Sequence, residues 1–166
     1  MSQKQTTALV HTTPGAAELF HALRAGERRS LARALSLVED ATPAAEALLE
    51  LSREAIAASP IRALRIGVTG PAGAGKSTLV DALTRELRAQ GRRVGILAVD
   101  PSSPFTGGAI LGDRIRLADF TADPAVYVRS VATRGHLGGL AAATEDMLTL
   151  LEAAGFDTLL IETTGV

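Results

Sequence analysis

The chain has 166 residues, a formal net charge of −1, a hydrophobic content of 46% and no cysteine. This length fits one ordinary domain, or a small domain with an appendage. Without cysteine the chain has no disulfide and no thiolate metal site, and its polar N-terminus lacks an apolar signal core, so we expect a cytoplasmic location. The charge shows no basic surplus for nucleic acid, and no apolar run approaches the roughly 20 residues that span a membrane.

The first 60 residues read as a frayed tail followed by helices. Residues 1–13 are polar, and from Ala16 apolar residues recur at spacings of three to four, which predicts helix. Gly26 predicts a break into two helices. Thr42 and Pro43 then open another helix, because threonine suits the N-cap and proline the first turn. We therefore predict a tail and helical extension over residues 1–60.

From residue 61 strands alternate with helices. Short apolar runs predict strands, and the segments between them have helical periodicity. Gly91 suits the position just after the first of these helices. Strands alternating with helices predict an α/β fold with a mainly parallel sheet whose faces are covered. The predicted strands are residues 64–69, 94–99, 125–131 and 158–162, and the predicted helices are residues 76–90, 110–120 and 137–154.

The first predicted strand runs into a glycine-rich loop that matches the pattern G-x₄-G-K-[ST]. Glycines let the backbone turn tightly, so that successive N–H groups point at phosphate oxygens, and the following helix adds its positive end. The lysine supplies a charge for the β- and γ-phosphates, and the serine hydroxyl ligates Mg²⁺. The residues expected around the phosphates are Gly70, Pro71, Ala72, Gly73, Ala74, Gly75, Lys76, Ser77 and Thr78.

Two aspartates have competing interpretations. Asp100 ends the second predicted strand, where the carboxyl ends of parallel strands face a ligand crevice, so it is a candidate for holding Mg²⁺. It also precedes Pro101, and Asp-Pro favours an ordinary turn. Asp113 precedes a helical stretch, and its spacing alone favours a helix N-cap over a metal ligand.

Glu162 ends the fourth predicted strand and is followed three residues later by Gly165. An acid after an apolar strand is typical of a Walker B element, which steadies Mg²⁺ and the attacking water, and the glycine N–H can reach the γ-phosphate. After the third predicted strand, Arg134 is a candidate phosphate contact, whereas His136 has no assigned role. The residues expected to take part in catalysis are Lys76, Asp100 and Glu162.

These segments together resemble the MeaB-type GTPases associated with methylmalonyl-CoA mutase, whose older label is arginine/ornithine transport-system ATPase or kinase. The matching pieces are GVTGPAGAGKSTLVDAL, VGILAVDPSSPFTGGAILGDRIRL, VYVRSVATRGHLGGLA and FDTLLIETTGV, and the lead-in RRSLARALSLVED also fits. The resemblance covers most of the chain after about residue 15.

The resemblance implies a P-loop GTPase that binds GTP or GDP with Mg²⁺, hydrolyses GTP slowly, and assists loading of adenosylcobalamin onto the mutase, which it also protects. It implies that Asp113 joins Ser77, Asp100 and Glu162 around Mg²⁺, which reverses the N-cap interpretation that spacing alone favours. Residues 102–116 become a candidate first switch loop. The family also implies a homodimer.

Two departures from the family stand out. Thr164 occupies a position where the family usually has valine. The sequence also stops at Val166, before further strands, a base-reading N-K-x-D segment and a dimerisation arm, so residues 61–166 are expected to form an incomplete GTPase domain. The choice of GTP over ATP therefore rests on the resemblance. A kinase or ATPase linked to amino-acid transport, and a nucleotide-binding module without turnover, stay open as alternatives.

Overall fold

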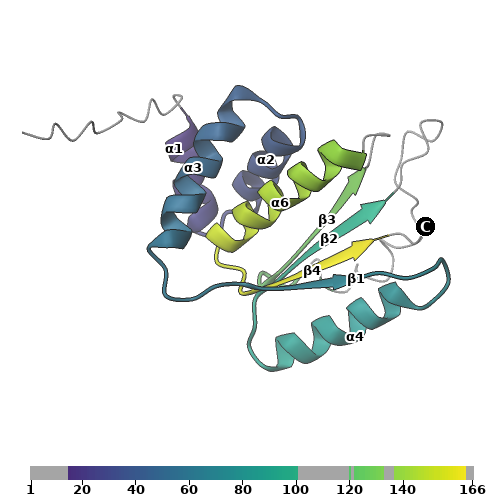
Figure 1. The fold of residues 1–166 in the computed structure, drawn as a ribbon. Coiled ribbons are helices and arrows are strands. Elements are labelled where there is room, and N and C mark those ends of the chain that lie inside the picture. The colour runs from purple at the N-terminus through teal and green to yellow at the C-terminus, as the bar shows by residue number, and fades with distance from the viewer. Residues whose placement is uncertain (1–14, 101–119, 121, 133–136, 164–166) are drawn as a thin grey trace, which may run out of the picture.

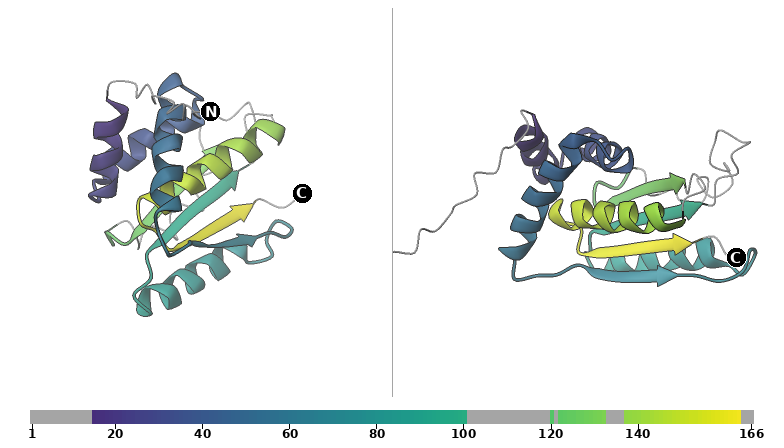
Figure 2. Two further views of the ribbon diagram at one scale, coloured as in Figure 1. Left: turned by 60° about the vertical axis from the view of Figure 1, so that its left-hand side comes forward. Right: turned by 45° about the horizontal axis from the view of Figure 1, so that its top comes forward.

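The structure is a computed structural model, and it describes residues 15–100, 120, 122–132 and 137–163. Its centre is a parallel sheet of four strands in the order β1-β4-β2-β3. Helix α4 covers one face of the sheet and helix α6 the other, as Figures 1 and 2 show. The predicted α/β fold with a parallel sheet is confirmed. The strands are β1 (Leu64–Val68), β2 (Val94–Asp100), β3 (Val126–Ala132) and β4 (Thr158–Thr163).

The helices that carry the apolar spacing form as predicted. Gly26 separates α1 from α2 with φ 90, a left-handed conformation that suits glycine, and Pro43 opens α3. Thr42 is the N-cap residue of α3, as predicted, although its hydroxyl donates to the carbonyl oxygen of Leu37 at 3.1 Å and makes no capping bond to α3. The helices are α1 (Ala16–Arg24), α2 (Arg28–Glu39), α3 (Pro43–Ala57), α4 (Lys76–Ala89) and α6 (Leu137–Ala153).

Several boundaries differ from the predictions by one or two residues, which is the ordinary uncertainty of helix and strand ends. Gly91 follows α4 with φ 78, and its N–H donates to the carbonyl oxygen of Arg88, so the predicted helix-ending glycine is confirmed. The helix predicted over residues 110–120 lies outside the described residues except for Phe120, which is buried. Each helix in the described ranges is too short or too polar to cross a bilayer.

Two hydrophobic cores lie on the two faces of the sheet. Under α4, Val80 packs with sheet residues that include Ile96 and Leu160. On the other face, α6 packs against Leu97 and Leu159, and the helices α1–α3 join this same core through residues such as Leu35 and Leu48. The division into an extension over residues 1–60 and a GTPase domain over residues 61–166 stays a prediction, although in space α1–α3 and α6 share one core.

Helix α2 is attached to the edge strand β3 by two arginines. The guanidinium of Arg28 donates to the carbonyl oxygen of Val126 at 2.8 Å, which gives this edge carbonyl a partner. Arg129 of β3 donates to the carboxylate of Glu39 and to the hydroxyl of Ser36, both on α2. Arginine forms such multiple contacts readily because its donors are fixed in one plane. The helical extension therefore covers the β3 edge.

The opposite edge strand, β1, is more exposed than a buried strand of a covered parallel sheet should be. Leu64 is 55% exposed, and only Val68 of the five residues is buried. The apolar run predicted a strand correctly, but it carried no information about how many neighbours the strand has. In the structure β1 pairs with β4 alone among the described strands.

Gly95 marks the closest approach between the sheet and α6. A Cβ atom at this position would lie 2.9 Å from Cδ2 of Leu159 and 3.3 Å from Cδ1 of Leu151, and both leucines are fully buried. We predict that Gly95→Val lowers the free energy of unfolding by about 1–3 kcal/mol, because side chains added to a packed core force neighbours out of place. Urea denaturation measures this, with Gly67→Val as the control, since a Cβ at Gly67 has no atom within 4 Å. Equal stability of the two variants would contradict the packing argument.

Asp123 joins α4 to the turn before β3. Arg88 of α4 donates from Nε to Oδ2 of Asp123 at 2.8 Å, and the N–H of Ala125 donates to Oδ1 at 2.8 Å. The hydrogen bond from Arg88, followed by that from Ala125, holds the pKa of Asp123 below its ordinary value. A lowered pKa in the folded state stabilises the protein above the unfolded pKa, and this stabilisation is lost as the pH falls through the folded pKa.

We therefore predict that Asp123→Asn destabilises the chain at pH 7 by about 1 kcal/mol or less, since the ion pair is partly exposed. The difference from the parent should shrink as the pH falls below about 4. Thermal unfolding from pH 7 to pH 3 measures both effects. The control is Asp81→Asn, which removes an i,i+4 ion pair with Arg85 on the exposed side of α4. A difference that does not change with pH would argue that the carboxylate charge is not responsible.

Candidate functional site

The predicted phosphate loop lies between β1 and the first turn of α4, at the carboxyl edge of the sheet. Gly70, Gly73 and Gly75 have φ values of 148, 76 and 85, which favour glycine over residues that carry a Cβ. Gly75 is the N-cap of α4 and has no side chain to cap it. The N-terminal N–H groups of α4 thus have no side-chain acceptor from the N-cap, which is the arrangement that binds phosphate.

Lys76, the first residue of α4, folds back over the loop. Its ammonium donates to the carbonyl oxygens of Gly70 at 2.8 Å and Pro71 at 2.9 Å. The lysine charge therefore lies against the loop rather than pointing away into solvent. A phosphate oxygen carries more negative charge than a peptide carbonyl, so it would compete well for the same ammonium protons.

Ser77 and Glu162 meet directly. The Ser77 hydroxyl donates to Oε1 of Glu162 at 2.6 Å, and Glu162 is only 7% exposed. A buried carboxylate needs such a donor, because an unpaired one would be strongly destabilised. The sequence predicted both residues for the Mg²⁺ site but did not predict their contact. The Ser77 proton is directed to Glu162.

The strand order explains why these two residues meet. Glu162 of β4 lies in register between Val68 at the end of β1 and Ala98 of β2. The loop that leaves β1 therefore starts beside the end of β4. Asp100 ends β2 at the same edge of the sheet, paired in register with Ala132. Its backbone position agrees with the prediction, and its role as a metal ligand stays a prediction.

The remaining predicted site residues, Asp113, Arg134, His136 and Gly165, lie outside the described residues. Within the described part of the chain, no three acidic or histidine side chains cluster in a way that could hold a metal ion. Of the four predicted Mg²⁺ ligands, Ser77, Asp100, Asp113 and Glu162, the structure describes the side chains of Ser77 and Glu162. The hydroxyl and carboxylate oxygens that meet there are of the type that Mg²⁺ prefers.

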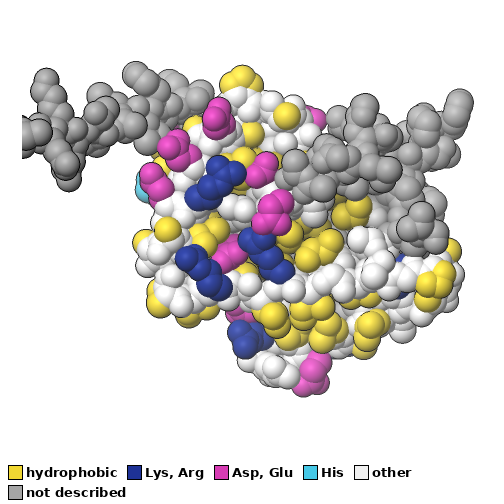
Figure 3. Space-filling model, in the orientation of Figure 1, with side chains coloured by type: hydrophobic (Ala, Val, Ile, Leu, Met, Phe, Trp, Pro, Cys, Tyr) yellow, Lys and Arg dark blue, Asp and Glu magenta, His cyan; other side chains and the backbone are white. Residues whose placement is uncertain are grey.

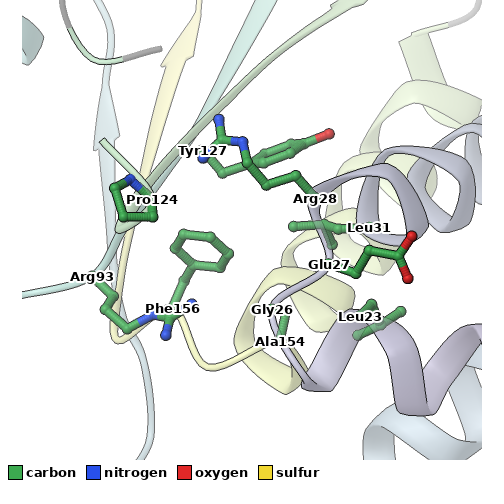
Figure 4. Close-up of a pocket in the computed structure, with 10 residues that line it drawn as sticks. All are labelled: Leu23, Gly26, Glu27, Arg28, Leu31, Arg93, Pro124, Tyr127, Ala154 and Phe156. Atoms are coloured by element: carbon green, nitrogen blue, oxygen red, sulfur yellow. The ribbon is translucent and has the colours of Figure 1, made fainter. Parts of the chain in front are cut away.

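A pocket at the opposite end of the sheet is a weaker candidate. Figure 4 shows Arg28 beside Tyr127 and Arg93 beside Phe156 around it, and each guanidinium lies over its ring, at 5.4 and 5.2 Å from the centroid. The space open to the centre of a water molecule is about 10 Å³, which is room for one water. These arginines therefore serve packing of α2 and the sheet, and the phosphate loop is the better site.

Comparison with known proteins decides the family. The sequence model of the family described as methylmalonyl Co-A mutase-associated GTPase MeaB matches residues 31–166, which include the loop, Lys76, Ser77 and Glu162. This chain belongs to the MeaB family. The resemblance stated from the sequence motifs is thereby confirmed.

Individual MeaB relatives agree with this assignment. The chain is 45% identical over 150 residues to the GTPase ArgK of Escherichia coli, covering 90% of this chain and 45% of that protein. It is 39% identical over 158 residues to the mouse protein named methylmalonic aciduria type A homolog, mitochondrial, covering 89% of this chain and 38% of the relative. A solved structure described as an LAO/AO transport system kinase matches with a TM-score of 0.66 and 36% identity, covering 91% of this chain and 43% of that one. This MeaB chain thus spans less than half the length of these relatives.

Proposed function

We propose that this chain binds GTP and GDP with Mg²⁺ on residues 70–78 and takes part in hydrolysis of the β–γ phosphoanhydride. The observation that carries the proposal is the contact of the Ser77 hydroxyl with the buried Glu162 carboxylate at the N-terminus of α4. This contact places a hydroxyl and a carboxylate, the oxygen ligands that Mg²⁺ prefers, beside the phosphate loop. Membership of a family described as GTPases supports the choice of guanine nucleotide.

The residues of the chain would act mostly by positioning and electrostatics. Lys76 would transfer its hydrogen bonds from Gly70 and Pro71 to phosphate oxygens. The backbone N–H groups at the start of α4 would bind the same phosphates, and Ser77 would offer its hydroxyl oxygen to the cation. When bound, Mg²⁺ would neutralise charge on the β- and γ-phosphates. Glu162 would keep the Ser77 proton directed away from the cation and orient a water.

Asp100 provides a test of the metal site. We predict that Asp100→Ala weakens the dependence of nucleotide binding on Mg²⁺, because one carboxylate close to the cation is removed. Calorimetric titration of GTP with and without Mg²⁺ measures this. Asp40→Ala, at the end of α2 and remote from the loop, is the control. The metal role is wrong if the Mg²⁺ effect on affinity is the same in Asp100→Ala and in the parent.

We further propose that the biological role is assistance to methylmalonyl-CoA mutase, in loading and protecting its adenosylcobalamin. The family description, which names the mutase, supports this proposal. The test is release of phosphate from GTP, compared with ATP, in the presence and absence of a mutase. Faster release of phosphate from GTP in the presence of the mutase is the expected result.

One solved structure similar to this chain is described as a kinase, and kinase activity is therefore the competing function. Transfer of radiolabelled phosphate to an amino acid or protein, rather than to water, would favour a kinase and contradict the GTPase proposal. Tight nucleotide binding with no phosphate release, even with mutase present, would indicate a binding module without turnover.

A further inference from the structure

An open hollow lies between the last turns of α3, the start of β1 and helix α6. The space in it that the centre of a water molecule can reach is about 310 Å³, compared with about 10 Å³ in the pocket of Figure 4. This is room for a small organic molecule, whereas the pocket of Figure 4 has room for one water. Figure 3 shows basic side chains grouped on this face of the molecule, with acidic side chains among them. The hollow is therefore large enough for a ligand, and charged groups set its chemistry.

Three arginines and one glutamate line this hollow. They are Arg53 of α3, Arg62 in the segment before β1, Arg65 of β1 and Glu152 of α6. Nη2 of Arg65 donates to Oε2 of Glu152 at 3.0 Å, and the N–H of Ala63 donates to Oε1 at 3.2 Å. Only 9% of the Glu152 side chain is exposed. The glutamate charge is therefore neutralised by Arg65, and an incoming anion meets the other two arginines.

Arg53 and Arg62 have donors to spare. Arg53 donates to Oδ1 of Asp146 at 3.3 Å, and its side chain is 62% exposed, so this ion pair contributes little and exchanges easily. Arg62 donates to the carbonyl oxygen of Ile56 in the last turn of α3, and among the described residues no carboxylate binds it. A guanidinium carries five N–H donors. Each of these two arginines can therefore bind a ligand without giving up the fold of the chain.

The hollow also has an apolar side. Ile56 and Ala57, three and four residues after Arg53 on α3, line it together with this arginine. Residues at this spacing lie on the same side of a helix. An organic anion can cover the apolar side with its hydrocarbon portion, whereas a small inorganic ion would leave it in water.

This hollow is separate from the phosphate loop. Arg62 and Arg65 lie before and near the amino end of β1, and the loop begins after the other end of the strand. A strand rises about 3.3 Å per residue, so Arg65 is roughly 10 Å from Val68, where β1 ends. A ligand in the hollow therefore does not compete directly with nucleotide phosphates.

We propose that this hollow binds a small organic oxyanion, a carboxylate or a phosphate monoester, which Arg53 and Arg62 hold together. The anionic oxygens accept paired N–H donors from the two guanidinium groups, the geometry for which arginine is suited. Arg53 exchanges Asp146 for the ligand, and the hydrocarbon portion lies against Ile56 and Ala57. The proposal is independent of the GTPase proposal, because none of these residues belongs to the phosphate loop.

Nuclear magnetic resonance titration of the isotope-labelled chain tests this, with succinate and phenyl phosphate as the probes. We expect saturable shifts of the Nε–Hε signals of Arg53 and Arg62, with a Kd of about 1 mM for the better probe. The probe that binds more tightly identifies the class of anion. Succinamide, which has a similar shape without the charges, and sodium chloride at equal ionic strength should cause no saturable shift.

Substitutions locate the binding. Arg53→Ala and Arg62→Ala should each weaken binding at least about tenfold, since each removes hydrogen bonds to a charged group. Arg62→Lys keeps the charge but not the planar fork, so it should restore only part of the affinity. The matched control is Arg33→Ala, an exposed arginine of α2 that does not line the hollow, and it should leave the affinity unchanged.

Thermal unfolding of each variant separates loss of the site from loss of folding. The proposal is overturned if neither probe causes a saturable shift, or if succinamide or chloride shifts the same signals equally. Binding that survives both alanine substitutions would also overturn it. Shifts confined to the amides of the phosphate loop would show that the probes bind there and not in the hollow.

Discussion

Lys76→Ala is expected to remove detectable nucleotide binding. In the structure the Lys76 ammonium is held against the phosphate loop by the carbonyl oxygens of Gly70 and Pro71, where it is placed to meet phosphate. Removing one partner from a desolvated charge pair costs at least about 2 kcal/mol, which is roughly a 30-fold loss of affinity, and often more. Isothermal calorimetry with GTP and Mg²⁺ measures the change. Unchanged affinity would refute the assignment of the loop.

The control must separate a local effect from a change in total charge. Arg92→Ala also removes one positive charge, but it lies in the turn after α4, at the end of the helix away from the loop. It should leave nucleotide affinity within about twofold of the parent, since exposed charges act weakly at a distance. The fold of Lys76→Ala should be intact, because the Lys76 ammonium binds backbone carbonyls of the loop itself.

The second large effect is expected at Glu162. Glu162→Gln keeps an oxygen that can accept the Ser77 proton, so the buried contact at 2.6 Å can survive while the negative charge is lost. We predict that GTP hydrolysis falls at least about 100-fold, the usual scale for loss of a group that positions or deprotonates water. Single-turnover phosphate release measures this. Affinity for GDP without Mg²⁺ should change little, because the proposal assigns binding of the phosphates to Lys76 and the loop.

A matched substitution controls for the loss of a carboxylate. Glu145→Gln on α6 removes an exposed acid that pairs with Arg65 on the other face of the sheet. Its effect on hydrolysis should be less than about twofold, as expected for an exposed pair of this kind. Equal hydrolysis rates for Glu162→Gln and the parent would contradict the catalytic role of Glu162 and leave it as a structural partner of Ser77.

Local structure was predictable wherever the signal was local. The spacing of apolar residues predicted α1 to α4, and Gly26, Pro43 and Gly91 predicted where helices begin or end. These features depend on backbone preferences of one or a few residues, which operate before any tertiary contact forms. Thr42 is the N-cap residue as predicted, but the sequence did not show that its hydroxyl would donate to the Leu37 carbonyl, near the end of the preceding helix.

Contacts between distant segments were not predictable in this way. Arg129 was not singled out in the sequence, yet it binds Glu39 and Ser36 across at least 90 positions of the chain. Arginine in a strand has no periodic signature that distinguishes such an anchor from a solvated side chain. The same holds for Gly95, whose role follows from the position of Leu151 and Leu159 around it.

The sequence by itself determined that a phosphate loop stands between a strand and a helix, because the pattern of glycines, Lys76 and Ser77 is specific to that geometry. It also determined the family, which residues 31–166 match. Only the tertiary structure decided that Ser77 bonds Glu162 and that β1 has one neighbour among the described strands. Strand order and register bring residues 85 positions apart to 2.6 Å, and they arise from packing of the whole sheet rather than from any local preference.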